Sequence, residues 1–108
     1  MEDILKLNLA EKIAFSDSEV NRQILLDSPQ MRVALICVDK GQIMEPHSAP
    51  FDLVMYCVSG KGVFIVGEEE ITVQSKEAVP CNAGIPHGFR APKDEQLVVM
   101  AVVAKCGG

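Results

Sequence analysis

The chain has 108 residues, of which 48% are hydrophobic and 23% are charged. This length and composition predict a single folded domain over residues 1–108 and argue against a disordered chain. The formal net charge is −5, from 10 basic and 15 acidic residues, and the basic residues do not cluster along the chain. We therefore expect neither a nucleic-acid partner nor binding to an anionic membrane.

The longest apolar run, Leu97–Ala104, is much shorter than the roughly 20 residues that a membrane-spanning helix needs. The start of the chain, Met1-Glu2-Asp3, lacks the basic residues and the apolar stretch of a signal peptide. Together these features predict a cytoplasmic location.

The first third of the chain carries weak patterns. Apolar residues between Ile4 and Ile13 fit neither the helical nor the strand period, so a short strand and a helical turn are both open there. Residues 23–26 are a candidate strand, followed by a turn at 27–29. We interpret residues 1–29 as an N-terminal strand or arm that precedes the main body at 30–104.

From residue 30 onward, short apolar strands alternate with turn signals. Pro46 is expected to end one strand, because proline cannot donate a ladder hydrogen bond. Residues 59–62 are expected to form a tight turn and residues 67–70 a hairpin loop. Leu97–Ala104 is expected to be a central strand or to lie at an interface. The expected strands are 32–38, 42–45, 53–58, 63–66, 71–74, 88–91 and 97–104, and residues 78–79 are expected to lead into a loop over 80–86. This spacing predicts an all-β sandwich or barrel.

Two stretches carry a family resemblance. The first has Gly41, then His47 six residues later, then Ser-Ala-Pro-Phe-Asp52, and a strand that ends at Gly60. The second reads Pro80-Cys-Asn-Ala-Gly84-Ile-Pro86-His87. This order resembles the two motifs of the cupin superfamily, and the His-x-Ala-Pro-Phe-Asp stretch resembles a subgroup of small bacterial cupins, mostly of unassigned function. The resemblance implies an all-β, double-stranded β-helix (jelly-roll) barrel with its core at 30–104.

The chain departs from the cupin pattern at the metal ligands. In metal-binding cupins three histidines and one glutamate hold a first-row divalent ion. Here His47 and His87 stand on motif positions, whereas Ala49 and Leu53 stand where the second histidine and the glutamate are expected. The resemblance therefore implies an incomplete set of metal ligands, with a divalent transition metal (Fe, Mn, Ni, Cu or Zn) as the possible cofactor. Within the second motif, the positions of glycine, proline and asparagine are taken by Lys76, Asn82 and Ala91.

Strand alternation suggests which side chains share a pocket with the histidines. If Leu53 points inward, Met55 and Cys57 also point inward, whereas Asp52 points the other way unless a bulge turns it. Phe89 shares a face with His87. We therefore consider Asp52, Met55, Cys57 and Phe89 as pocket residues, with Cys57 the deepest. The four cysteines form no Cys-x-x-Cys pair, and we expect Cys37 and Cys57 to be buried free thiols.

Three functions follow as hypotheses. The first is a small-molecule-binding cupin with its ligand in the barrel pocket around His47 and His87. The second is a metal-dependent enzyme of dioxygenase or isomerase type, in which substrate or water completes the His/His shell. The third is a sensory or interaction module. The resemblance also implies a homodimer.

Overall fold

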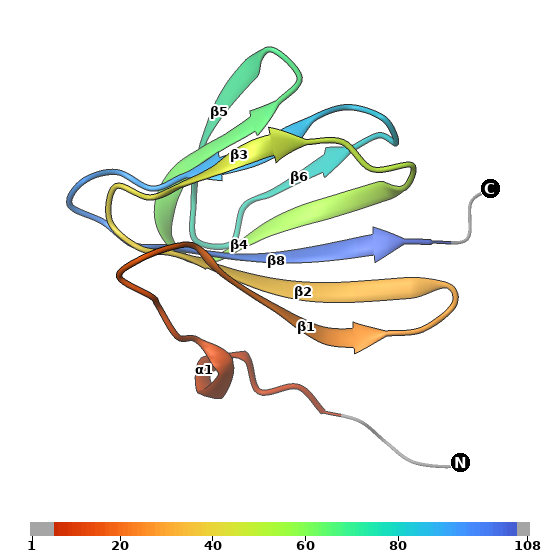
Figure 1. Ribbon diagram of the computed structural model, residues 1–108, viewed down its shortest axis with the longest axis horizontal. Helices are drawn as coiled ribbons and strands as arrows, with labels where there is room; N and C mark the ends of the chain where they lie inside the picture. Colours follow the sequence, from red (N-terminus) through yellow and green to blue (C-terminus); the bar gives the residue numbers. More distant parts are fainter. Residues whose placement is uncertain (1–5, 106–108) are drawn as a thin grey trace.

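The computed structural model describes residues 6–105, which form eight strands and one short helix (Figure 1). No helix in this part of the chain is long and apolar enough to cross a membrane. In chain order the elements are α1 (Leu9–Lys12), β1 (Asn21–Asp27), β2 (Met31–Val38), β3 (Ile43–His47), β4 (Asp52–Val66), β5 (Glu69–Gln74), β6 (Ala78–Cys81), β7 (His87–Arg90) and β8 (Leu97–Ala104).

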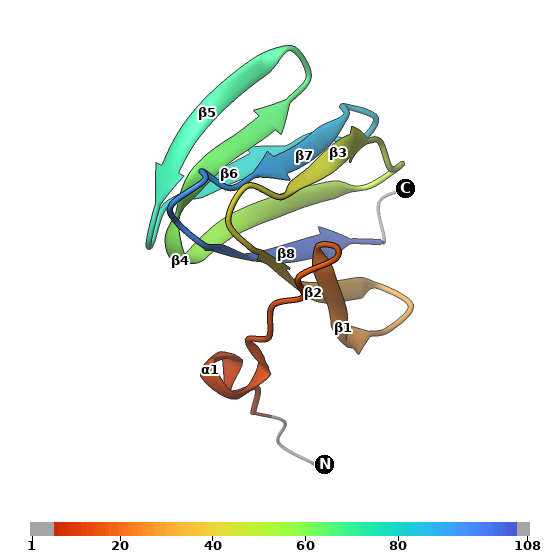
Figure 2. The same ribbon diagram turned by 60° about the vertical axis from the view of Figure 1, so that its left-hand side comes forward.

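The strands form two facing sheets that share β4, as Figures 1 and 2 show from two directions. The hydrogen-bonded order is β1-β2-β8-β4-β7-β3, and β5 and β6 also pair with β4. Every pairing is antiparallel. This arrangement is the predicted double-stranded β-helix. β8 lies between β2 and β4, so the Leu97–Ala104 run is a central strand.

The expected tight turn at 59–62 is wrong, because β4 runs through it as one strand. The first part of β4 pairs with β8 and β6, and the part from Lys61 onward pairs with β5 and β7. A bulge lies between Cys57 and Ser59, and Gly60 has a φ of +80°. The glycine adopts a left-handed conformation that other residues rarely take, and the strand passes from one sheet to the other at that point.

The expected strand end at Pro46 is also wrong, because β3 continues to His47. β3 lies at the edge of the sheet and pairs only with β7 among the described strands. An edge strand tolerates a proline, since its outer N–H groups have no ladder partner to lose. The pairing of β3 with β7 is irregular between Met44 and His47 and resumes at His47.

Other boundaries differ by a few residues. β5 begins at Glu69, so the hairpin loop consists of residues 67–68 rather than 67–70. β1, within the predicted arm, pairs with β2 from Asn21↔Cys37 to Asp27↔Arg32 and is therefore part of the sheet. The region before β1 contains the one-turn helix α1, whereas Ile4 lies outside the described residues.

Two hydrophobic clusters hold this fold together. The inner cluster fills the space between the sheets and includes Phe64 and Phe89, whose rings meet edge to face at a centroid distance of 5.2 Å. The outer cluster lies on the opposite face of β2 and β8, where Ile13 and Phe15 pack against Leu35, Cys37 and Val98. The N-terminal region therefore covers part of the outer face of its own sheet.

Candidate functional site

The two histidines of the chain meet on neighbouring strands. His47 on β3 and His87 on β7 are directly paired in the ladder, with ring centroids 4.7 Å apart and ring planes tilted by 55°. His87 is only 5% exposed, whereas His47 is exposed. The pair therefore extends from solvent into the barrel.

A backbone contact orients the buried ring. Nδ1 of His87 lies 3.2 Å from the carbonyl oxygen of Ile85. A carbonyl oxygen only accepts, so Nδ1 carries the proton in this contact, and Nε2 of the neutral ring keeps its lone pair. Burial lowers the pKa of His87, the Ile85 contact opposes that effect, and His47 lowers the pKa further. The structure therefore favours the neutral form of this side chain.

Cys81 is a neighbour of His87 that the sequence did not suggest. Its sulfur lies 3.9 Å from Nδ1 of His87 and 3.6 Å from the Ile85 carbonyl oxygen. Burial raises the pKa of Cys81, and the carboxylate of Asp52 raises it further. Since the reactive form of cysteine is the thiolate, a raised pKa argues against a nucleophilic role for Cys81.

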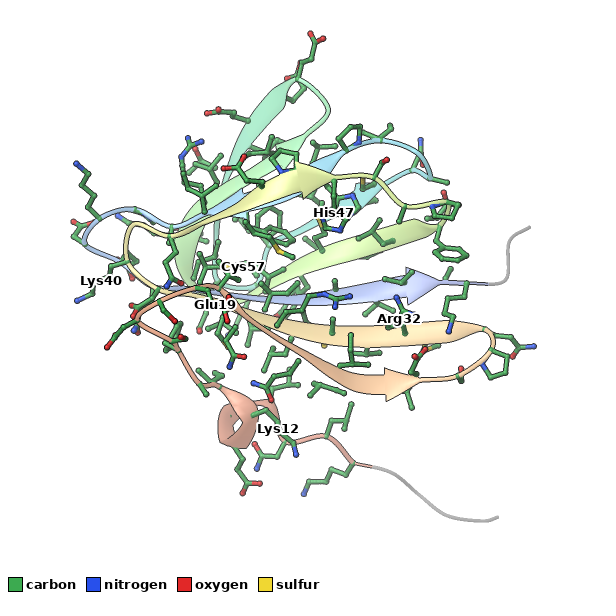
Figure 3. All side chains as sticks on the ribbon, viewed as in Figure 1. Lys12, Glu19, Arg32, Lys40, His47 and Cys57 are labelled. Atoms are coloured by element: carbon green, nitrogen blue, oxygen red, sulfur yellow. The ribbon has the colours of Figure 1, made fainter. Side chains whose placement is uncertain are left out.

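Both histidines line a cavity of about 100 Å³ between the two sheets. Its walls are mostly apolar, and the ionisable side chains among its described lining residues are two arginines and the two histidines. Figure 3 shows Arg32 and His47 on the two facing sheets. The lining residues are Arg22, Arg32, Ala34, Ile36, Met44, His47, Ala49, Phe51, Leu53, His87, Phe89, Ala101 and Val103.

The residues proposed from strand alternation are divided between different places. Phe89 lines the cavity with the histidines. Met55 and Cys57 point inward and are fully buried in the inner cluster, outside the cavity lining. Asp52 is exposed, and its Oδ1 accepts a hydrogen bond of 2.8 Å from the backbone N–H of Ala83. It therefore anchors the 82–86 loop rather than facing the histidines.

Sequence reasoning missed the two arginines of the cavity. Alternation along β2 places Arg32 on the same face as Ala34 and Ile36, so the sequence pattern did indicate that Arg32 points inward. Arg22 has no comparable signal. It reaches the cavity only because β1 pairs with β2 in the register that sets Arg22 opposite Ile36.

The donor set does not fit a metal ion held as in metal-binding cupins. Ala49 and Leu53, which replace two of the four ligands, both line the cavity with their hydrocarbon side chains. The described lining retains two imidazoles and has no carboxylate. Across residues 6–105, no group of three or more His, Cys, Asp or Glu side chains is placed to hold a metal ion. Two imidazoles alone are fewer ligands than structural and catalytic zinc sites use.

A larger hollow of about 700 Å³ has no histidine among its described lining residues. It lies at the ends of β4, β6 and β8, beside the turn between β1 and β2. We call it the outer groove. Its apolar lining includes Leu26, Met31, Val54, Pro80 and Val102. The outer groove and the histidine cavity are therefore lined by different residues, except that Leu53 and Val103 line both.

Comparison with known proteins agrees with the fold. The cupin domain profile matches residues 34–103, whereas no curated protein matches the chain. The structure of TT1209 from Thermus thermophilus is 26% identical, with a TM-score of 0.86 over 92% of this chain and 95% of that one. An uncharacterised conserved protein with a double-stranded β-helix domain from Klebsiella pneumoniae is 19% identical, with a TM-score of 0.88 over 95% and 91%.

A structure with a stated activity is more distant. The polyketide cyclase RemF from Streptomyces resistomycificus is 18% identical, with a TM-score of 0.72 over 82% of this chain and 66% of that one. At this identity the similarity concerns the fold alone. The double-stranded β-helix, the paired motif histidines and the profile match define the class: the chain belongs to the cupin family.

Proposed function

We propose that this chain is a small-molecule-binding cupin whose ligand occupies the cavity at His47 and His87. The observation that carries the proposal is the meeting of the two histidines at the wall of a mostly apolar cavity. Ligand sites commonly combine apolar walls with a few polar groups that fix orientation. We further propose that the chain belongs with the small cupins that carry the His-x-Ala-Pro-Phe-Asp stretch.

The two histidines serve different purposes in this proposal. His87 is buried and held by the Ile85 carbonyl, so its Nε2 offers a fixed hydrogen-bond acceptor for a ligand hydroxyl or amide. His47 is exposed and lies at the rim of the cavity. Phe51 and Phe89 provide apolar wall. A volume near 100 Å³ is well below the roughly 300–1,000 Å³ of typical ligand pockets, so the enclosed part of the ligand is small.

A thermal-shift screen of small polar metabolites, followed by amide NMR, tests the proposal. We expect at least one class of compound to raise the midpoint of unfolding and to shift the amide signals of His47, His87 and Phe89. The variant His87→Gln should lose the response, whereas Lys61→Gln, outside the cavity, should retain it. A library in which no class raises the midpoint would contradict the proposal.

The metal-dependent enzyme is less well supported, because the described lining of the cavity has two imidazoles and no carboxylate. Elemental analysis of untagged protein, after growth and reconstitution with Fe, Mn, Ni, Cu or Zn, separates the two functions. We expect less than one metal ion per chain in the parent protein and no further loss in His47→Ala. Stoichiometric metal that disappears in His47→Ala would make the enzyme the better explanation.

A further inference from the structure

We infer that the ligand is a small organic anion, a short-chain carboxylate, whose carboxylate pairs with the guanidinium groups of Arg32 and Arg22. This inference rests on the proposed function and names the ligand class for the same cavity. Its basis is the placement of two arginines, and no acidic side chain, in the described lining of a cavity within a chain whose net charge is −5.

Strand register brings both arginines to the cavity. Arg32 lies on β2 and shares its inward face with Ile36, because the two positions are an even number of residues apart. Arg22 on β1 is directly opposite Ile36, and directly opposed residues of neighbouring strands point to the same side of a sheet. Both arginines therefore face the sheet that carries the histidines, and both line the same cavity.

Arg32 is incompletely paired within residues 6–105. Its Nε is buried and makes no hydrogen bond there. Within the described residues, the carboxylate that pairs with Arg32 is that of Asp27, whose Oδ1 is 3.5 Å from this Nε and only 2.7 Å from Nζ of Lys105. Asp27 is thus held mainly by Lys105 and does not line the cavity. Among residues 6–105, Asp27 is the only acidic residue that forms an ion pair with Arg32, so an anion in the cavity can pair with the other guanidinium nitrogens.

The chemistry of the lining matches a carboxylate better than a neutral ligand. A guanidinium presents a planar fork of N–H donors that pairs with both oxygens of a carboxylate. No acidic side chain of the described lining competes for these donors. The apolar walls, which include Phe51, Leu53 and Phe89, suit a short carbon chain, and the volume limits the enclosed part of the ligand to a few heavy atoms.

The experiment is an NMR titration of the full chain with short mono- and dicarboxylates, from acetate to succinate, each paired with its neutral amide. The buffer contains no other organic anion. We expect saturable shifts of cavity amides with carboxylates and weaker binding of the matched amides. Arg32→Gln should weaken carboxylate binding about tenfold to hundredfold, as the loss of a charge-assisted hydrogen bond does, and Arg22→Gln should also weaken it.

Two further variants serve as controls for the titration. Arg90→Gln removes an arginine that pairs with Glu70 outside the cavity, and it should bind like the parent. Arg32→Lys keeps the charge but not the planar fork, so it should bind with intermediate strength even if Arg32→Gln folds poorly. Equal binding of amides and carboxylates, or unchanged binding in both Arg32 variants, would overturn the inference and leave small-molecule binding intact. No binding by either panel would overturn the inference, and the proposed function would fail as well only if the wider library also found no ligand.

Discussion

His47 and His87 face one another across the β3–β7 pair, with ring centroids 4.7 Å apart, although one ring is exposed and the other is buried. The contact depends on β3 continuing through Pro46, since a strand that ended before the proline would leave His47 unpaired in a loop. The nearby His47 ring contributes to lowering the pKa of His87. Because this lowering makes the free energy of unfolding depend on pH, the histidine pair affects the stability of the barrel as well as its cavity.

The first prediction concerns acid stability. Burial lowers the pKa of His87, with a further contribution from His47 and opposition from the Ile85 contact, so the unfolded chain binds a proton more readily at this residue than the folded chain does. The free energy of unfolding should therefore fall as pH drops below about 6.5, until pH is below the folded pKa of His87. Urea unfolding between pH 8 and pH 5 measures this fall.

The matched variants for this prediction are His87→Gln and His47→Gln. His87→Gln should show a smaller fall in the free energy of unfolding over the same pH range. His47→Gln keeps the buried ring of His87 and should show most of the fall seen in the parent protein. The parent protein and both variants have the same carboxylates, so the contribution of the carboxylates to the pH dependence cancels in the comparison. An unchanged fall in His87→Gln would contradict the prediction.

The second prediction concerns the corner of β4. Gly60 has a φ of +80°, and a Cβ at this position would overlap the backbone carbonyl oxygen of Gln96. Gly60→Ala should therefore cost at least about 3 kcal/mol in the free energy of unfolding, which places it among the severe point mutations. Gly84→Ala is the control, because Gly84 also has a positive φ but has open space around it. Its cost should be about 1–2 kcal/mol, and equal costs would contradict the role of the overlap.

The third prediction is a stabilising substitution. Lys76 has a φ of +75° and occupies the position where the second cupin motif has glycine. A left-handed conformation costs an ordinary residue about 1–2 kcal/mol, and glycine would remove this cost. Part of the resulting stabilisation is offset because glycine has more conformational freedom in the unfolded chain. Lys76→Gly should therefore raise the free energy of unfolding by about 0.5–1 kcal/mol. Lys76→Ala, which keeps the strain, should show no gain, and a loss of stability in Lys76→Gly would refute the prediction.

The fourth prediction concerns thiol chemistry. Cys37, Cys57 and Cys81 are buried free thiols. Burial, with a contribution from Glu77, raises the pKa of Cys57 to about 11, and burial also raises the pKa of Cys37 and Cys81. At pH 8 only about one thousandth of Cys57 is thiolate, so a thiol reagent should leave all three unmodified in native protein and label them in urea. A Cys106→Ser background is used because Cys106 lies outside the described residues, and rapid native labelling would contradict the prediction.

The fifth prediction is the homodimer implied by the family resemblance. We propose that a second copy covers the outer groove, where Met31 and Val54 remain 42% and 43% exposed on the outward face of the sheet. Light scattering at tens of micromolar should give the mass of a dimer, and Val54→Lys should give that of a monomer. Ile43→Lys changes another exposed apolar residue, on β3 and outside the groove, and should leave the dimer intact. A monomeric parent protein would refute the proposal.

The alternation of apolar residues was sufficient to predict most strands and an all-β sandwich or barrel, and the resemblance of two motifs to those of cupins implied the jelly roll. β2 and β8 agree with the predicted strands to within a residue, because both carry long apolar runs between clear turn signals. Apart from shifts of a few residues at other boundaries, the errors fall at Pro46 and at residues 59–62. In both places a local signal for ending a strand was outweighed by position in the sheet: β3 is an edge strand, and β4 uses Gly60 to pass between the sheets.

Local periodicity and motif spacing were enough to indicate the all-β class, the cupin resemblance and the two histidines as candidate site residues. They could not indicate which side chains share a cavity with the histidines, because that depends on how distant strands pair. Arg22 and Arg32 join the histidines through the pairing of β1 with β2 and the facing of two sheets, whereas Asp52, Met55 and Cys57 lie elsewhere. Strand register sets such neighbours over long sequence separations, and a register shift of one residue would turn each side chain to the opposite face.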